Sequence, residues 1–288
     1  MPATEDEVVR HWTHGGLERA IRDGLAAMGR ELESAQPEDL AAVDELHMGG
    51  HEATVHLAKR MGLKQGTSLL DIGSGLGGPA RFFAGHYGCT VVGIDVTPEY
   101  VAVSELLTRT TGLTERVSFQ VGSATDLPFG TARFDAATLV HVGMNIPDKN
   151  ALCAEAARVL APGGVFGVYE VMRVGEGALA FPVAWADTAA MSFVEGPATY
   201  RRALHAAGFE IAAEEDRRDA ALAFFRRMKA HMAESGPPPL GLHIHMGRDA
   251  PLKVANMIAN LERGIVAPIE MICRLRVDRR SNNQDLRV

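Results

Sequence analysis

The chain has 288 residues, of which 47% are hydrophobic, and its 29 basic and 36 acidic side chains give a formal net charge of −7. This length and hydrophobic content allow a substantial buried core, and the acidic balance without a basic stripe argues against nucleic acid as a partner. The N-terminus lacks the apolar segment of a signal peptide, and no apolar run is long enough to span a bilayer. We therefore expect a cytoplasmic protein without membrane binding, and the oligomeric state stays unknown.

The N-terminal part, residues 1–58, is predicted to form a helical cap. Leu17, Ile21, Leu25 and Met28 recur at the spacing of one helical face, after a break at Gly15 and Gly16. The last residues, 278–288, are polar and are expected to form a flexible tail.

Between them, residues 59–277 alternate short apolar runs with helical patterns, which predicts an α/β core with a mostly parallel sheet. Strands are expected at 67–72, 89–96, 116–121, 134–141 and 165–172, then after Gly208, and finally at 266–277. Two lid insertions are expected at about 173–195 and 219–264. The charged run 213–219 is interpreted as an exposed turn.

The three cysteines, Cys89, Cys153 and Cys273, are far apart and stand in apolar contexts. An odd number of separated cysteines favours buried free thiols over disulfides or a metal cluster.

A glycine-rich segment, Asp71-Ile-Gly-Ser-Gly-Leu-Gly-Gly78, follows the first core strand and precedes a helix. Glycines there allow a ligand to approach the backbone, and the helix N-terminus offers free N–H groups. Together with Asp95 at the end of the next strand, the loop fits both a dinucleotide and S-adenosylmethionine. Asp71 favours the second cofactor, because a carboxylate repels a pyrophosphate and attracts an ammonium group.

Four motifs in order, LLDIGSGLGG, GIDVT, VGSATDLPFGTARFDAATLVH and RVLAPGGVFGVYEV, resemble the class I methyltransferase family over about residues 60–175. The resemblance implies a Rossmann-like seven-stranded sheet and S-adenosylmethionine as the cofactor. It implies cofactor contacts by position: Asp71, Gly73 and Gly75 at the methionine part, Asp95 at the ribose, Val96 beside the adenine, and Ser123 and Ala124 at the adenine edge. The family commonly has Asp where Ser123 stands, so one charge is missing there.

His141, at the end of the fourth predicted strand, is the candidate general base and also lies beside the expected cofactor site. Met144 and Asn145 follow it between the cofactor and the acceptor. The alternative is a histidine that packs at a strand end and bonds to backbone.

Aromatic residues of the lid are candidate acceptor contacts. Phe181 and Trp185, with Tyr169, are placed to attract a cationic acceptor through their ring faces. The alternative is that these aromatics form the core of the lid.

His243 and His245 stand two residues apart, so in an extended segment both side chains would face the same way. We assign them to the acceptor pocket. A metal triad with His141 is disfavoured, because no carboxylate follows at ligand spacing, and we expect no metal.

The segments VDELHMGGHEATVHLA and GSGLGGPAR resemble sarcosine and dimethylglycine methyltransferases. This resemblance implies that His47 closes over the cofactor, with a capped loop before a helix as the alternative. It also favours an amine nitrogen of a small molecule as the methyl acceptor. Methylation of oxygen or carbon in a specialised metabolite is the alternative, and two other classes stay open: an NAD-dependent oxidoreductase and a non-catalytic cofactor-binding subunit.

Overall fold

A computed structural model describes residues 4–277, so the predicted tail at 278–288 lies outside the described residues. A single sheet of seven strands forms its centre, in the order β3-β2-β1-β4-β5-β7-β6. The strands are β1 (Ser68–Ile72), β2 (Thr90–Asp95), β3 (Val117–Val121), β4 (Phe134–Val140), β5 (Leu160–Arg173), β6 (Phe209–Asp216) and β7 (Val266–Leu275). The first five pair in parallel and β7 runs antiparallel to β5 and β6. The predicted fold class is confirmed.

Helices cover both faces of the sheet. The helices of one face are α4 (Gly50–Met61), α5 (Gly78–Tyr87) and α6 (Pro98–Thr110), and those of the other are α7 (Lys149–Val159) and α8 (Pro197–Ala206). Side chains alternate between the two faces along β1, so each face needs its own layer of helices. Leu69 packs with α4, α5 and α6, and Leu70 packs with α7 and α8. A parallel sheet buried on both faces follows.

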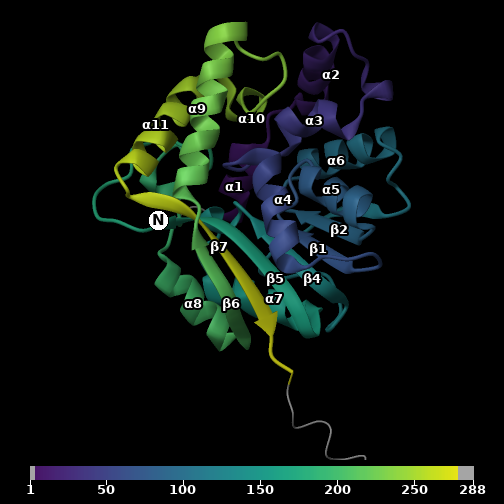
Figure 1. The fold of residues 1–288 in the computed structure, drawn as a ribbon, viewed down its shortest axis with the longest axis vertical. Coiled ribbons are helices and arrows are strands. Elements are labelled where there is room, and N and C mark those ends of the chain that lie inside the picture. Colours follow the sequence, from purple (N-terminus) through teal and green to yellow (C-terminus); the bar gives the residue numbers. More distant parts are fainter. Residues whose placement is uncertain (1–3, 278–288) are drawn as a thin grey trace, which may run out of the picture.

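Two further groups of helices meet at one end of the sheet (Figure 1). The N-terminal group contains α1 (Glu5–Trp12), α2 (Leu17–Ala27), a short 3₁₀ turn (Leu32–Ser34) and α3 (Pro37–Asp44). The lid group contains α9 (Arg218–Ser235), α10 (His243–Met246), a 3₁₀ turn (Gly247–Asp249) and α11 (Ala250–Glu262). Two more 3₁₀ turns, Gly143–Asn145 and Ala189–Met191, lie in the connections on either side of α7 and β5.

The carboxylate of Glu99 in α6 fastens the turn between α1 and α2. Its two oxygens accept hydrogen bonds of 2.7 to 3.0 Å from the backbone N–H groups of four consecutive residues, 14–17. These bonds lower the pKa of Glu99 to about 2 against the opposing effect of its partial burial. The N-terminal group is therefore anchored to the core through a charge.

Three details differ from the sequence-based expectation. The strand expected from residue 165 begins at Leu160, with a register shift between Phe134 and Ala136 that accommodates residues 161–164. The run 213–219 is not a turn, because it continues β6 and begins α9. Met28 is 44% exposed, since α2 ends at Ala27.

Two other expectations concern burial and membranes. Cys89, Cys153 and Cys273 are buried free thiols, as predicted. Among the helices of residues 4–277, none combines the length and the apolar character needed to cross a bilayer.

Candidate functional site

A cavity of about 530 Å³ opens at the carboxyl ends of β1, β2 and β4, between the sheet and the two groups of helices. Ligands of open α/β sheets bind at this edge, where the connections leave the strands. The volume is in the range of small-molecule and cofactor sites. Most residues that the sequence predicts for the cofactor and the acceptor lie on its wall.

The glycine loop after β1 forms the floor of the cofactor part. Gly73 has φ of +71°, and a Cβ atom built there would lie 2.3 Å from Val142 Cγ2. Its backbone N–H donates to the Ile94 carbonyl at 2.8 Å, which ties the loop to β2. Glycine is required because both the backbone conformation and the close contact exclude a side chain.

Asp71 is a buried carboxylate with an unsatisfied oxygen. Thr138 Oγ1 donates to Asp71 Oδ1 at 2.7 Å, whereas Oδ2 has no hydrogen-bond partner in the described residues. Burial raises the pKa of Asp71 to about 7. A cationic ligand beside Oδ2 would stabilise the ionised form, so this atom fits the ammonium group of a methionine moiety.

Asp95, at the end of β2, holds the loop and faces the cavity. Its Oδ2 accepts from the Gly75 N–H at 3.0 Å and its Oδ1 from the Thr97 N–H at 2.8 Å. Each carboxylate oxygen has a second lone pair, so the side chain can still accept from a ligand hydroxyl. Asp95 and Val96 both line the cavity, and their contacts to the ribose and the adenine stay predictions.

Ser123 and Ala124 line the same part of the cavity, after β3. The Ser123 hydroxyl is already engaged, because it donates to Glu5 Oε2 at 2.9 Å. Helix α1 thus covers the expected adenine edge, and Glu5, Val8 and Trp12 belong to the wall. Sequence analysis missed these three residues, because an N-terminal helix pattern does not reveal which part of the core it covers.

His141 follows β4 and faces the cavity in an uncommon backbone conformation, with φ of +54°. Its Nδ1 lies 3.2 Å from the Tyr169 carbonyl, which can only accept, so Nδ1 carries the proton. Nε2 is buried and has no partner in the described residues. Burial holds the pKa of His141 well below its usual range, with a smaller contribution from His47. The ring is therefore neutral, and Nε2 offers a free lone pair.

Glu170 in β5 is hydrogen-bonded to the backbone of the connection after His141. Glu170 Oε1 accepts from the Val142 N–H at 2.8 Å, and Oε2 is buried without a partner in the described residues. A Cβ atom on Gly143 would lie 2.2 Å from the Tyr200 hydroxyl, so the backbone passes tightly between Glu170 and Tyr200. Burial raises the pKa of Glu170 to about 7. Sequence analysis missed this residue, because a lone glutamate in a strand carries no motif.

Three of the predicted acceptor contacts lie on the wall: Met144, Asn145 and Trp185. Asn145 Nδ2 donates to the Trp185 carbonyl at 2.9 Å, which joins the segment after β4 to the lid. The lid helices add residues that sequence analysis did not single out, namely Phe224, Phe225, Leu242, Met246 and Met257. They fall in the predicted insertion 219–264, whose helical pattern does not indicate which part of the core it covers.

Four predicted acceptor contacts are not on this wall, which corrects the sequence-based assignment. The Tyr169 hydroxyl donates to the Met48 carbonyl at 2.8 Å, and Phe181 packs in the lid core. His243 and His245 lie on the helix α10 instead of an extended segment, so they do not point the same way. His243 is exposed, whereas His245 is buried between the Tyr100 hydroxyl and the Val43 carbonyl, each at 2.8 Å.

His47 lies on the wall beside His141, with 5.9 Å between the ring centroids. Its Nε2 donates to the Gly50 carbonyl at 3.0 Å, which fixes the approach to α4. The ring is buried, and burial lowers its pKa.

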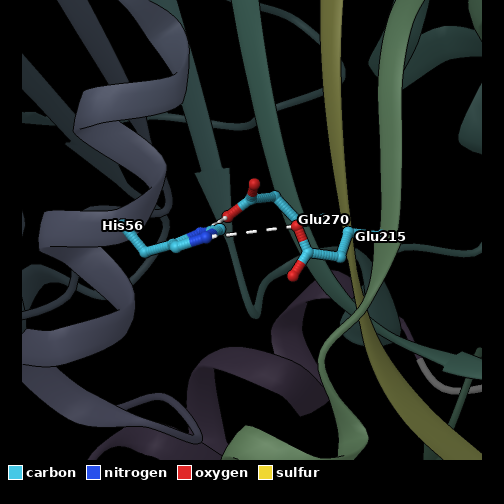
Figure 2. Close-up of side chains that lie close together, drawn as sticks. All are labelled: His56, Glu215 and Glu270. Atoms are coloured by element: carbon cyan, nitrogen blue, oxygen red, sulfur yellow. Dashed lines mark hydrogen bonds and ion pairs between the residues drawn. The ribbon is translucent and has the colours of Figure 1, made fainter.

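One cluster elsewhere has the composition of a metal site. Figure 2 shows His56 in α4 facing Glu270 and Glu215 on the neighbouring strands β7 and β6. Two arginines occupy the same cluster: Arg60 lies 2.9 Å from Glu270, and Arg217 donates to His56 Nε2 at 2.9 Å. Two cations beside two carboxylates already balance the charge, so this cluster is an ion-pair network that joins α4 to the sheet.

Comparison with known proteins identifies the central segment. The family model of the methyltransferase domain matches residues 70–168. The chain is 33% identical over 137 residues to Methyltransferase GfsG of Streptomyces halstedii, covering 48% of this chain and 49% of that protein. It is 33% identical over 182 residues to Sterol 24-C-methyltransferase of Eremothecium gossypii, covering 60% and 48%. The chain thus spans about half the length of the curated relatives it matches.

Solved structures share the fold over more of the chain. The [4+2]-cyclase SpnF has a TM-score of 0.70 and 24% identity, covering 96% of this chain and 98% of that chain. Geranyl diphosphate C-methyltransferase from Streptomyces coelicolor A3(2) has a TM-score of 0.68 and 18% identity, covering 96% and 99%. A structure provisionally named sarcosine dimethylglycine methyltransferase, from Galdieria sulphuraria, has a TM-score of 0.63 and 20% identity, covering 78% and 85%.

The likeness to sarcosine-type enzymes is therefore one of fold, and it does not confirm an amine acceptor. The domain match and the glycine loop with Asp71 also leave no support for the NAD alternative. Residues 70–168 therefore match a methyltransferase domain, and the unpartnered Asp71 Oδ2 beside the glycine loop, among the described residues, fits S-adenosylmethionine as its cofactor.

Proposed function

We propose that this protein transfers the methyl group of S-adenosylmethionine to a carbon atom of a small molecule. The observation that carries the proposal is the buried Nε2 of neutral His141, which has no partner among residues 4–277 and belongs to a cavity lined both by the glycine loop and by apolar side chains. The names of the sterol 24-C-methyltransferase relatives support carbon over nitrogen. Methylation of oxygen is the second candidate, because His141 can also accept a hydroxyl proton.

The residues fit the cofactor in two ways. Gly73 lines the cavity with backbone alone, because a Cβ atom there would clash with Val142, and Asp71 Oδ2 has no partner among residues 4–277 and could accept from an ammonium group. Asp71 would bind the methionine part, and Asp95 the ribose hydroxyls. When bound, S-adenosylmethionine supplies an electrophilic methyl group and its own leaving group.

The chain has to orient the acceptor, exclude water and accept a proton. In methyl transfer to carbon, the acceptor carbon forms a bond to the methyl group while the methyl–sulfur bond breaks, and a proton then leaves the acceptor. His141 Nε2 is placed to accept that proton, because its low pKa keeps it unprotonated at neutral pH. Trp185 and the lid helices line the cavity with apolar side chains, which would help to keep water from the reacting atoms.

The direct test uses S-adenosylmethionine labelled with ¹³C in the methyl group and a panel of sterols, isoprenoid alcohols, phenols and amines. We expect a new carbon-bound methyl resonance in the product spectrum. A label that appears only on nitrogen would contradict the proposal, and a protein that binds S-adenosylhomocysteine yet labels nothing would favour a non-catalytic role of the domain. The fold likeness to a [4+2]-cyclase makes this assay necessary, since fold alone does not fix the reaction.

A variant pair tests the role of His141. His141→Asn should lower turnover by about two to four orders of magnitude and change the affinity for S-adenosylhomocysteine far less, as expected for a lost general base. His243→Gln is the matched control, because His243 is exposed and does not line the cavity. Equal turnover in His141→Asn and the wild type would remove His141 from the mechanism.

A further inference from the structure

Apolar side chains from four segments line one part of the cavity: the loop before α4, the turn after β4, the lid segment and the lid helices. We call this set the apolar wall and take it as the acceptor site. Its members are Met48, Met144, Trp185, Phe224, Phe225, Leu242, Met246 and Met257.

Within residues 4–277, no lysine or arginine lines the cavity. Lysines next to the wall are already bonded to other groups: Lys149 Nζ donates to the carbonyls of Ile146 and Phe193, the second at 2.8 Å, and Lys253 lies 3.0 Å from Asp187. Arg81 pairs with Asp44 at 2.6 Å, and both side chains are almost completely buried. A phosphate or carboxylate in the acceptor part would thus lose its hydration without gaining a cation.

The N-terminus of α7 is the backbone feature that comes closest to an anion site, since Asp148 and Ala151 both line the cavity. It is already occupied by a negative charge, because Asp148 Oδ1 accepts from the N–H groups of Asn150 and Ala151, each at 2.9 Å. A second anion there would be repelled by this carboxylate.

A cationic acceptor fits no better. The acids on the wall are Glu5, Asp44, Asp71, Asp95 and Asp148, and none belongs to the apolar wall. Asp44 is paired with Arg81, Asp148 caps α7, and Glu5 accepts from Ser123. Asp71 and Asp95 lie at the cofactor part, where the cofactor brings a positive charge of its own.

From this distribution of charge we infer that the acceptor is an uncharged, hydrocarbon-rich molecule, whose polar group, if any, faces His141 Nε2. The inference rests on the proposed function in taking the apolar wall as the acceptor site. It excludes the phosphorylated and the zwitterionic acceptors that the names of several structural neighbours indicate. The physical basis is that the wall offers dispersion and apolar burial, while His141 Nε2, which lines the same cavity and has no partner among the described residues, can accept a hydrogen bond.

The test measures binding without requiring transfer. Geraniol, geranyl phosphate and geranylamine share one hydrocarbon chain and differ in charge, and each is titrated calorimetrically into the protein loaded with S-adenosylhomocysteine. We expect geraniol to bind at least about tenfold more tightly than either charged molecule. Equal or tighter binding of a charged molecule, or no binding of geraniol, would overturn the inference.

Two variants locate the effect. Met257→Lys places an ammonium in the apolar wall and should shift the preference towards geranyl phosphate by about tenfold or more relative to the wild type. Met28→Lys makes the same change at a site that is 44% exposed and outside the cavity, and should shift nothing. If Met257→Lys does not fold, the wild-type comparison decides alone. Tight geraniol binding without any labelled methyl transfer would contradict the proposed function and leave the inference standing.

Discussion

Cofactor binding should weaken as the pH falls through 7, because Asp71 must be ionised to hold an ammonium group. In the ligand-free protein, burial raises the pKa of Asp71 to about 7, and its Oδ2 has no partner among the described residues. A bound cation stabilises the ionised form, so binding releases a proton wherever the free carboxyl is protonated. The affinity therefore rises with pH through about 7 and levels off only where Asp71 is fully ionised.

The magnitude follows from the ionised fraction of Asp71. With a pKa of about 7, about half of the side chains are ionised at pH 7 and about 3% at pH 5.5, so the affinity should fall roughly fifteenfold over that interval. The α-amino group of the ligand titrates at a pH of about 8, above this interval, so it stays protonated and the change in affinity reports Asp71.

The assay is calorimetric titration with S-adenosylhomocysteine at several pH values, in buffers of different ionisation enthalpy. At pH 7 we expect release of roughly half a proton per molecule bound. Asp71→Asn keeps an acceptor for Thr138 and removes the charge, so its affinity should be lower and independent of pH over the same interval. A wild-type affinity that is flat from pH 5.5 to 7, without proton release, would refute the reasoning.

Three further outcomes follow from the site. Asp95→Ala should weaken binding of S-adenosylhomocysteine more than tenfold, since hydrogen bonds to a charged group are worth about 1.5 to 3 kcal/mol. An unchanged affinity in calorimetric titration would contradict the assignment of Asp95 to the ribose. The raised pKa of Glu170 means that its contribution to stability is greatest below pH 4.5 and is lost as the pH rises towards 7. Urea unfolding from pH 5 to 8 should show this loss in the free energy of unfolding, and the loss should be smaller in Glu170→Gln. If the free energy of unfolding falls equally with pH in the variant and the wild type, Glu170 is not its cause. Gly73→Ala should destabilise the fold by about 1 to 3 kcal/mol through its φ and its contact with Val142, whereas Gly85→Ala in the open middle of α5 should not, as thermal unfolding can show.

The cofactor half of the site could be predicted from the sequence because it depends on local chain order. A strand, a glycine turn and a helix place Asp71, Gly73 and Gly75 within one short segment, and Asp95 ends the adjacent parallel strand. Parallel register then brings these carboxyl ends to one edge of the sheet, so spacing along the chain was enough.

The acceptor half depends on packing between segments that are far apart in the chain, which spacing does not encode. Tyr169 shows the difference: its strand was predicted, but its side chain does not line the cavity and its hydroxyl donates to the Met48 carbonyl. His245 was expected in an extended segment, and the short helix α10 turns it towards Val43 instead. Phe224 and Phe225 of α9 lie in the predicted insertion 219–264, but the sequence did not indicate that they line the cavity.

Helix α1 touches both halves of the cavity. At one end Glu5 accepts from Ser123 at the cofactor edge, and at the other His11 Nε2 lies 2.9 Å from the Ala184 carbonyl, next to Trp185 of the apolar wall. A ligand that contacts α1 on one side thus contacts a helix that also forms part of the other ligand's wall. By thermodynamic linkage, any change that the cofactor makes in the affinity for the acceptor equals the change that the acceptor makes in the affinity for the cofactor.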